Sequence, residues 1–207
     1  SPYAEAVSLE SGGVKKDIKG EYVVVKIGSK LSGTAPVSAW RLESASKKIK
    51  VTIGPAADIP FLGQVNIESD FAAGPKSTIY VATGRSPNGA SFRLNICTGY
   101  FEQFQDFVPT LRKECPDPKD EAMRTGNEGV LGNESCVNFI ETLGTCEYRF
   151  NEIPPNIGSI CQNFILNELS YAGCINAHKN DPDFYRNEWH IFLERDQELW
   201  NNNHEVI

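Results

Sequence analysis

Six cysteines constrain the fold of this chain more than any other feature of its sequence. Their number is even, and no two of them have the C-x-x-C spacing that is typical of zinc knuckles and redox motifs. Because disulfides form and persist in oxidising compartments, we expect three disulfides in a protein that is extracellular or displayed on a cell surface. The six residues are Cys97, Cys115, Cys136, Cys146, Cys161 and Cys174.

The balance of charges argues against a nucleic-acid partner. The 207 residues include 27 acidic and 20 basic side chains, which gives a formal net charge of -7. A surface of that sign repels polyphosphate. Lysines gather in the first fifty residues, where we interpret them as solvated strand edges that discourage aggregation. They include Lys15, Lys16, Lys19, Lys47, Lys48 and Lys50.

The sequence contains no membrane-spanning or targeting segment. Nowhere do about 18 apolar residues run together, and no charged-then-apolar signal segment opens the chain. We therefore expect any signal peptide or membrane anchor to lie outside these 207 residues.

Residues 1–116 have the pattern of a β-rich domain. Short runs of β-branched and aromatic residues alternate there with Gly, Pro, Asn and Ser. Pro87 followed by Asn88 and Gly89 predicts a tight turn within residues 84–89. The runs predict strands at residues 6–11, 21–27, 36–42, 49–53, 77–83 and 91–97, with a further short strand at 64–67 inside a long connection.

The pattern changes after Pro116. Residues 117–134 are polar and have the composition of an exposed connecting segment. Apolar residues at i, i+3, i+4 and i+7 from Cys136 to Leu143 then predict a short helix with Ser135 as its N-cap. The same spacing from Cys161 to Leu169 predicts a second helix that ends at Gly173.

A third helix is predicted from residue 180 or 181 to about residue 200. Pro182 suits its first turn, and Asp183 suits the positive end of its dipole. On this interpretation Tyr185, Trp189 and Phe192 face inward. Residues 204–207 are predicted to be an extended piece that returns to the sheet.

The helix positions suggest how the cysteines pair. If the first two helices form an antiparallel hairpin, opposite helix ends meet. This arrangement favours pairing of Cys136 with Cys174 and of Cys146 with Cys161, which leaves Cys97 to pair with Cys115. Sequential pairing of residues 136 with 146 and 161 with 174 remains the alternative.

The chain resembles lamin-tail domains, an immunoglobulin-like β-sandwich family. Residues 21–27 (EYVVVKI) followed by 39–42 (AWRL) are similar to the opening "EYVxI … GWxL" of that family. A bacterial branch carries a Cys-rich helical insertion in the sandwich, and its recurring segments extend the similarity over nearly the whole chain. They resemble residues 83–87, 91–93, 95, 97–101, 103–105, 115–117, 180–181, 183–185, 188–189 and 199–200.

The resemblance implies a mainly β fold with an α lobe. We expect a lamin-tail-like β-sandwich over residues 1–116, a disulfide-stapled helical insertion over 117–203, and a return strand at 204–207. The family offers no catalytic residues, so the expected function is an extracellular or cell-surface interaction or adhesion module that binds a surface protein or a glycan. The alternatives are a self-assembling subunit of an envelope or extracellular filament, and a hydrolase whose active site is assembled from distant residues.

No motif for a metal, a cofactor or catalysis is present in the sequence. His190 and Glu194 are four residues apart and suit a surface pair on a helix better than a metal site. The acidic residues near Asp181 are explained by helix capping. Among the tryptophans, Trp40 and Trp189 suit the core, whereas Trp200, beside three asparagines, is expected to be exposed and to contact a ligand.

Overall fold

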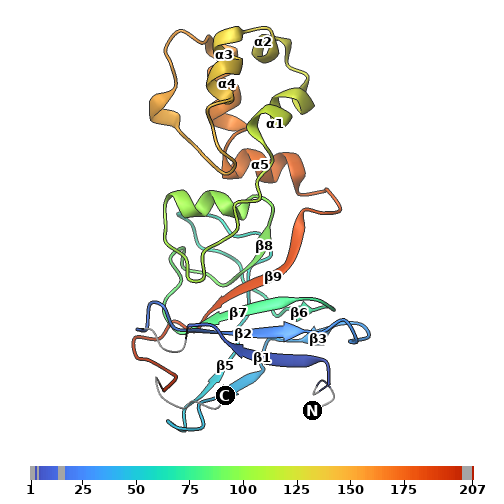
Figure 1. Ribbon diagram of the computed structural model, residues 1–207, viewed down its shortest axis with the longest axis vertical. Coiled ribbons are helices and arrows are strands. Elements are labelled where there is room, and N and C mark those ends of the chain that lie inside the picture. The colour runs from blue at the N-terminus through green and yellow to red at the C-terminus, as the bar shows by residue number, and fades with distance from the viewer. Residues whose placement is uncertain (1–2, 4, 14–16, 202–206) are drawn as a thin grey trace. The chain divides into compact units, whose positions relative to one another are not determined.

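The computed structural model describes residues 3, 5–13, 17–201 and 207 (Figure 1). The chain forms two compact units, each made of several segments. The β unit comprises residues 1–94, 106–110 and 186–207, and the Cys-rich unit comprises residues 95–105 and 111–185. The boundaries expected at residues 116 and 203 differ from this division, which places residues 95–105 with the helices and residues 186–201 with the strands.

A five-stranded sheet forms most of the β unit, with the order β1-β2-β7-β9-β8 (Figure 1). Strands β1, β2 and β7 pair in antiparallel fashion, whereas β7 and β9 run parallel with Ile79 opposite Trp189. The strands are β1 (Val7–Ser11), β2 (Tyr22–Ile27), β7 (Thr78–Ala82), β8 (Phe92–Asn95) and β9 (Tyr185–Phe192).

Two small sheets complete the β unit. Strand β3 (Ala35–Pro36) pairs with β6 (Ala72–Ala73), and β4 (Arg41–Glu43) pairs with β5 (Lys50–Thr52). One face of the large sheet supplies alternate residues to a core that also contains residues of the small sheets and their connections, as the period-2 geometry of strands requires. The core includes Val23, Val25, Ile79, Val81, Trp189 and Ile191 together with Val37, Leu42 and Ile53.

Most of the predicted strands are confirmed. Those at residues 6–11, 21–27, 49–53, 77–83 and 91–97 correspond to β1, β2, β5, β7 and β8. The run at 36–42 is split between β3 and β4, because Ala39 adopts a left-handed conformation with φ 74°. Residues 64–67 are not a strand. The predicted turn is confirmed, since the Gly89 N–H donates to the Ser86 carbonyl over 3.2 Å.

The predicted third helix is wrong, because its centre is strand β9. This strand lies between β7 and β8, and residues 188–192 are all buried. A strand covered on both faces shows no alternation of polar and apolar residues, so its aromatic residues also matched a helical spacing. Consequently His190 and Glu194 do not pair on a helix. The Glu194 carboxylate instead accepts a hydrogen bond from the Ser86 N–H at 2.8 Å.

The prediction that Trp200 is exposed is also wrong. Trp200 has no exposed surface and belongs to the core of the β unit. The buried carboxylate of Glu21 accepts hydrogen bonds from the N–H groups of Leu199 and Trp200, each at 2.9 Å. This contact fixes the segment against the start of β2. The predicted return strand lies largely outside the described residues, because residues 204–206 are not among them.

Five helices form the Cys-rich unit, with two short 3-10 segments. The predicted helix from residue 136 is α3, although Asn133 rather than Ser135 is its N-cap. The predicted helix from residue 161 is two helices, and Ser170 caps the second. The helices are α1 (Pro118–Thr125), α2 (Glu128–Leu131), α3 (Glu134–Ile140), α4 (Ser159–Asn167) and α5 (Tyr171–His178), and the 3-10 segments are η1 (Thr98–Gln103) and η2 (Phe150–Glu152).

The connecting segment expected at residues 117–134 is helical. The Asp117 carboxylate accepts the Lys119 N–H at 2.9 Å and so caps α1, and Gly126 ends that helix with φ 60°. The side chain of Asn127 then caps α2 in the same way. Short helices with polar exposed faces are rich in capping residues, which explains why this segment has the composition of a loop.

Candidate functional site

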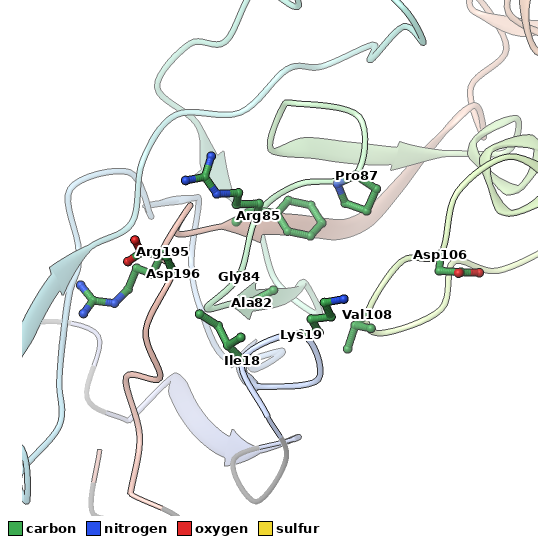
Figure 2. A pocket seen from close by; sticks show the side chains of 11 residues that line it. Ile18, Lys19, Ala82, Gly84, Arg85, Pro87, Asp106, Val108, Arg195 and Asp196 are labelled. Carbon is green, nitrogen blue, oxygen red and sulfur yellow. The ribbon is translucent and has the colours of Figure 1, made fainter.

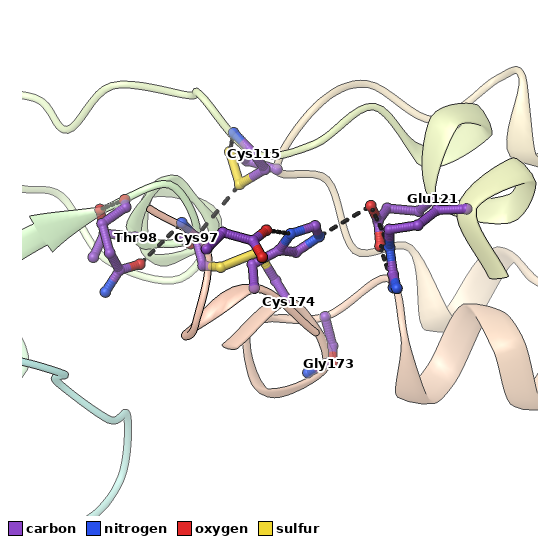
Figure 3. Close-up of a disulfide and its surroundings, with 12 residues drawn as sticks. Cys97, Thr98, Cys115, Glu121, Gly173 and Cys174 are labelled. Atoms are coloured by element: carbon purple, nitrogen blue, oxygen red, sulfur yellow. Dashed lines mark hydrogen bonds and ion pairs between the residues drawn. A yellow bond between two sulfur atoms is a disulfide. The ribbon is translucent and has the colours of Figure 1, made fainter. Parts of the chain in front are cut away.

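Three disulfides staple the Cys-rich unit, but not in the predicted pairs. Cys97 is bonded to Cys174 (Figure 3), Cys115 to Cys146, and Cys136 to Cys161. Both the favoured pairing and the sequential alternative are therefore wrong. The hairpin model failed because Cys136 and Cys161 each lie in the first turn of their helices, so the starts of α3 and α4 meet.

The helical core of this unit is small, which explains its need for disulfides. Its buried cluster contains ten residues, and Cys136 and Cys161 are two of them. Domains with little apolar surface to bury are commonly stabilised by cross-links. The cluster consists of Ala122, Val130, Cys136, Ile140, Leu143, Ile157, Cys161, Phe164, Ile165 and Leu169.

A buried histidine lies between two carboxylates in the Cys-rich unit. The Nδ1 atom of His178 is 2.7 Å from Asp181 Oδ2, and its Nε2 atom is 3.0 Å from Glu121 Oε1. Glu121 also forms an ion pair with Arg124 at 2.8 Å. Both ring nitrogens can donate at once only when the imidazole is protonated.

This arrangement makes His178 a link between two acidic side chains of the Cys-rich unit. Glu121 in α1 and Asp181 after α5 are thereby tied to the same side chain (Figure 3 labels Glu121). Asp181, considered above as a helix cap, holds His178 instead. No group of three or more His, Cys, Asp or Glu side chains in the described part of the chain could hold a metal ion.

Two tyrosines of the Cys-rich unit, Tyr100, which is buried, and Tyr171, which is half-buried, have raised pKa values. Burial raises the pKa of Tyr100, and the nearby charge of Glu121 raises it further. Burial also raises the pKa of Tyr171, although its hydrogen bond with Asn95 acts in the opposite direction. Both residues therefore stay neutral in the folded protein at pH values where an ordinary tyrosine ionises.

We predict that alkaline pH destabilises the folded protein. An ordinary phenol ionises near pH 10, so stability from the two neutral phenols is fully present below about pH 10. This stability is lost as the pH rises from about 10 toward the raised pKa that each tyrosine has in the folded protein. The loss is about 1.4 kcal/mol per pH unit for each tyrosine. Urea denaturation at pH values between about 8 and 11 measures this loss.

The matched control for alkaline destabilisation is the pair of variants Tyr100→Phe and Tyr171→Phe. Phenylalanine cannot ionise, so each variant should flatten the decline in stability above pH 10. Native-state absorbance near 295 nm that reports ionisation of both phenols close to pH 10, without unfolding, would contradict the prediction.

The most exposed apolar side chains of the β unit lie in one loop. Val65 is 97% exposed and Ile67 is 90% exposed, and Phe61 in the same loop is 37% exposed. We call residues 61–67 the apolar loop. Exposed apolar side chains that occur singly are normal at protein surfaces. Two β-branched residues this exposed, two positions apart, leave apolar surface that a partner can bury.

Hydrogen bonds fix the shape of the apolar loop. The amide oxygen of Asn66 accepts the Phe61 N–H at 2.7 Å, and its amide nitrogen donates to the Phe61 carbonyl at 3.0 Å. The chain enters and leaves this excursion through a β-bridge in which Ala56 and Ser69 exchange two hydrogen bonds of 3.0 Å. The Asn66 side chain therefore fixes the conformation of the loop that carries its two neighbours, Val65 and Ile67.

Sequence reasoning missed the apolar loop as a site. The sequence predicts only a short strand at residues 64–67, inside a long connection of weak periodicity. The available signal was the surrounding sequence: Gly63, Gln64 and Asn66 are turn or polar residues that suit an exposed, internally bonded loop.

The search for a membrane-spanning helix and the comparisons with known proteins do not identify the chain. None of the described helices is long and apolar enough to cross a membrane. Comparison of the chain with protein-family models, with curated proteins and with solved structures finds no match in any of the three.

Proposed function

We propose that this chain is an extracellular or cell-surface interaction module without catalytic activity, which binds another protein through the apolar loop. The observation that carries the proposal is the near-complete exposure of Val65 and Ile67 on a loop held by the Asn66 amide. Burying a Val or Ile side chain contributes about 1.5–3 kcal/mol, and a loop fixed in advance loses little conformational entropy on binding.

The remaining parts of the proposal concern the fold family and the compartment. The two packed layers of strands in the β unit support an immunoglobulin-like, lamin-tail-like β-sandwich as its fold. Three disulfides are typical of an oxidising environment, which supports a location outside the cell or on its surface. A surface protein suits the apolar loop better than a glycan, since Val65 and Ile67 offer no hydrogen-bonding groups in their side chains.

An array of extracellular proteins and glycans, probed with the full disulfide-bonded chain, tests this proposal. We expect a protein on the array to bind with a Kd in the micromolar range or below. The variant Val65→Ser/Ile67→Ser should bind that protein at least about 100-fold more weakly, because two buried aliphatic side chains are lost.

The control variant is Met123→Ser, which changes a side chain that is 52% exposed in the Cys-rich unit and should leave binding unchanged. The free energy of unfolding of each variant should lie within about 0.5 kcal/mol of that of the unchanged chain, as is usual for surface substitutions. Equal binding by the loop variant and the unchanged chain, or binding to glycans alone, would refute the proposal.

A self-assembling subunit is the second candidate, and one observation favours it. Among the described strands, β1 is an edge of the five-stranded sheet, and an apolar groove lined by Tyr3, Val7, Leu9 and Trp40 lies beside it. Edge strands can accept a strand from another chain. Sedimentation velocity decides between the candidates: concentration-dependent oligomers would favour assembly, and a monomer at high concentration would exclude it.

A further inference from the structure

Strand β1, an edge of the sheet among the described strands, has peptide groups that face away from the sheet. The Gly28 N–H donates to the Ala6 carbonyl at 2.6 Å, which makes these two residues a hydrogen-bonded pair at the start of the β1–β2 ladder. Such pairs recur at every second residue of an antiparallel ladder, so Ser8 and Glu10 bond to β2. The N–H and carbonyl groups of Leu9, between them, therefore face outward, and no hydrogen bond reaches them from the described residues.

An apolar groove opens beside this edge, between β1 and the small sheet that contains β4. Val7, Leu9 and Val25 line it from the five-stranded sheet, and Trp40 and Leu42 line it from the β4 segment. We call it the edge groove. Leu9 is 37% exposed, so apolar surface remains open there. A strand that pairs with Leu9 directs every second side chain to the groove face, because side chains alternate along a strand.

One positive charge lies in the edge groove without a counter-charge. Arg41 is the one charged residue among the described residues that line the groove. No ion pair joins it to another residue in the described part of the chain. An incoming strand with a carboxylate among its groove-facing side chains therefore complements the charge of the groove.

A second copy of β1 does not supply that carboxylate. Pairing of two β1 strands brings Val7, Leu9 and Ser11 of the other copy to the groove face. Glu10 lies on the opposite face, where it forms an ion pair with Lys26 at 2.7 Å. Charge complementarity therefore favours a segment of a different protein as the occupant of the groove.

We propose that the edge groove binds an extended, acidic segment of a partner protein as an additional antiparallel strand on β1. The segment exchanges main-chain hydrogen bonds with Leu9, places two aliphatic side chains in the groove and pairs a carboxylate with Arg41. In strand addition of this kind, the main-chain bonds supply affinity and the pockets for alternate side chains supply specificity. Antiparallel pairing is the slightly more stable arrangement per residue. The site is separate from the apolar loop.

Backbone-amide NMR titration of the full disulfide-bonded chain with a defined peptide tests this proposal. The probe is acetyl-Asp-Thr-Val-Thr-Val-Thr-Asp-amide, in which the two valines and both aspartates share one face of a strand. We expect it to shift the amide signals of β1 with a Kd below about 1 mM. Replacing both valines with serine should weaken binding at least about tenfold. Replacing both aspartates with asparagine should weaken it about two- to fivefold, as for an exposed ion pair.

N-methylated peptides show whether the probe binds as a strand. In an antiparallel pair, the residues opposite Leu9 that face the groove direct their N–H groups toward β1. Methylation of the two valine nitrogens should therefore weaken binding at least about tenfold. Methylation of two threonine nitrogens, which face away from β1, is the matched control and should leave binding unchanged.

Variants of the chain locate the bound carboxylate. Arg41→Gln should abolish the preference for the aspartate peptide over the asparagine peptide. Arg85→Gln is the matched control and should retain it, because Arg85 lines a separate pocket at the end of β7, where its guanidinium group points away from Val108 (Figure 2). The Val65→Ser/Ile67→Ser chain should bind the peptide like the unchanged chain, which distinguishes failure of the edge groove from failure of the apolar loop.

Leu9→Pro removes the outward N–H and should abolish peptide binding, as read from the Ser11 signal. A thermal melt shows whether this variant folds, and Arg41→Gln carries the test if it does not. The proposal is overturned if the peptide shifts no β1 signal at about 5 mM, if the asparagine peptide binds as well as the aspartate peptide, or if methylated threonines rather than valines weaken binding. Signals of β1 that shift with protein concentration in the absence of peptide would also overturn it, because the occupant would then be a second copy.

Discussion

Replacing Cys97 and Cys174 together with alanine is expected to lower the free energy of unfolding of the Cys-rich unit by about 4 kcal/mol. The two cysteines are 77 residues apart, and the Cys115–Cys146 bond, which remains in this variant, shortens the loop that they close. Cross-linking distant residues removes loop-closure entropy from the unfolded chain, and the effect grows with the logarithm of loop length. The small helical core cannot replace so large a contribution.

Hydrogen exchange of the amides in α3, α4 and α5 measures this loss within the unit itself. The matched control is Cys115→Ala/Cys146→Ala, whose loop spans 31 residues, so a loss of about 3.7 kcal/mol is expected. Unchanged protection of the helices after removal of the Cys97–Cys174 bond would contradict the role given to it. Peptide mapping without reduction checks the pairing itself.

Replacing Trp200 with alanine is expected to destabilise the β unit by about 3–5 kcal/mol. The side chain has no exposed surface, so its removal loses apolar burial and leaves a cavity. The Glu21 carboxylate accepts a hydrogen bond from the backbone N–H of Trp200 at 2.9 Å. This bond prevents the segment from collapsing freely into that cavity. Urea denaturation followed by the near-ultraviolet circular dichroism of the remaining tryptophans measures the change.

The conservative control is Trp200→Phe, which keeps most of the apolar volume and should cost less than the alanine variant. Acrylamide quenching adds a direct reading of exposure, since a buried indole is protected from the quencher. Equal stability of the alanine variant and the unchanged chain, together with easily quenched Trp200 fluorescence in the unchanged chain, would show that Trp200 is a surface residue after all.

The strands near the N-terminus could be predicted because local chemistry determines them. In β2 the residues Val23, Val25 and Ile27 face one core, and β-branched residues recur at that spacing. Strand β9 could not be distinguished from a helix by the same reasoning. Trp189, Phe192 and their neighbours are buried on both faces of a central strand, so their burial depends on β7 and β8, which are distant in sequence.

The disulfide pairs and the candidate sites depend even more on distant contacts. Cys97 meets Cys174 only because α5 forms as a separate helix after a break at Ser170. The sequence predicts a single helix across this break. The edge groove is lined by residues from three segments that are separated in the chain. No local motif marks such a site. Residues 64–67 were predicted to be a short strand, so neither the apolar loop nor the exposure of Val65 and Ile67 was predicted.

Photo-crosslinking from the apolar loop tests the central functional claim most directly. Benzoylphenylalanine placed at position 65 of the full chain, and in a separate protein at position 123, is irradiated on cells that display the protein found on the array. The account predicts a crosslink to that protein from position 65 and none from position 123. An excess of the unmodified chain should abolish this crosslink, whereas an excess of the Val65→Ser/Ile67→Ser chain should leave it unchanged. Crosslinks of equal yield from both positions, or none from position 65 while binding persists, would contradict it.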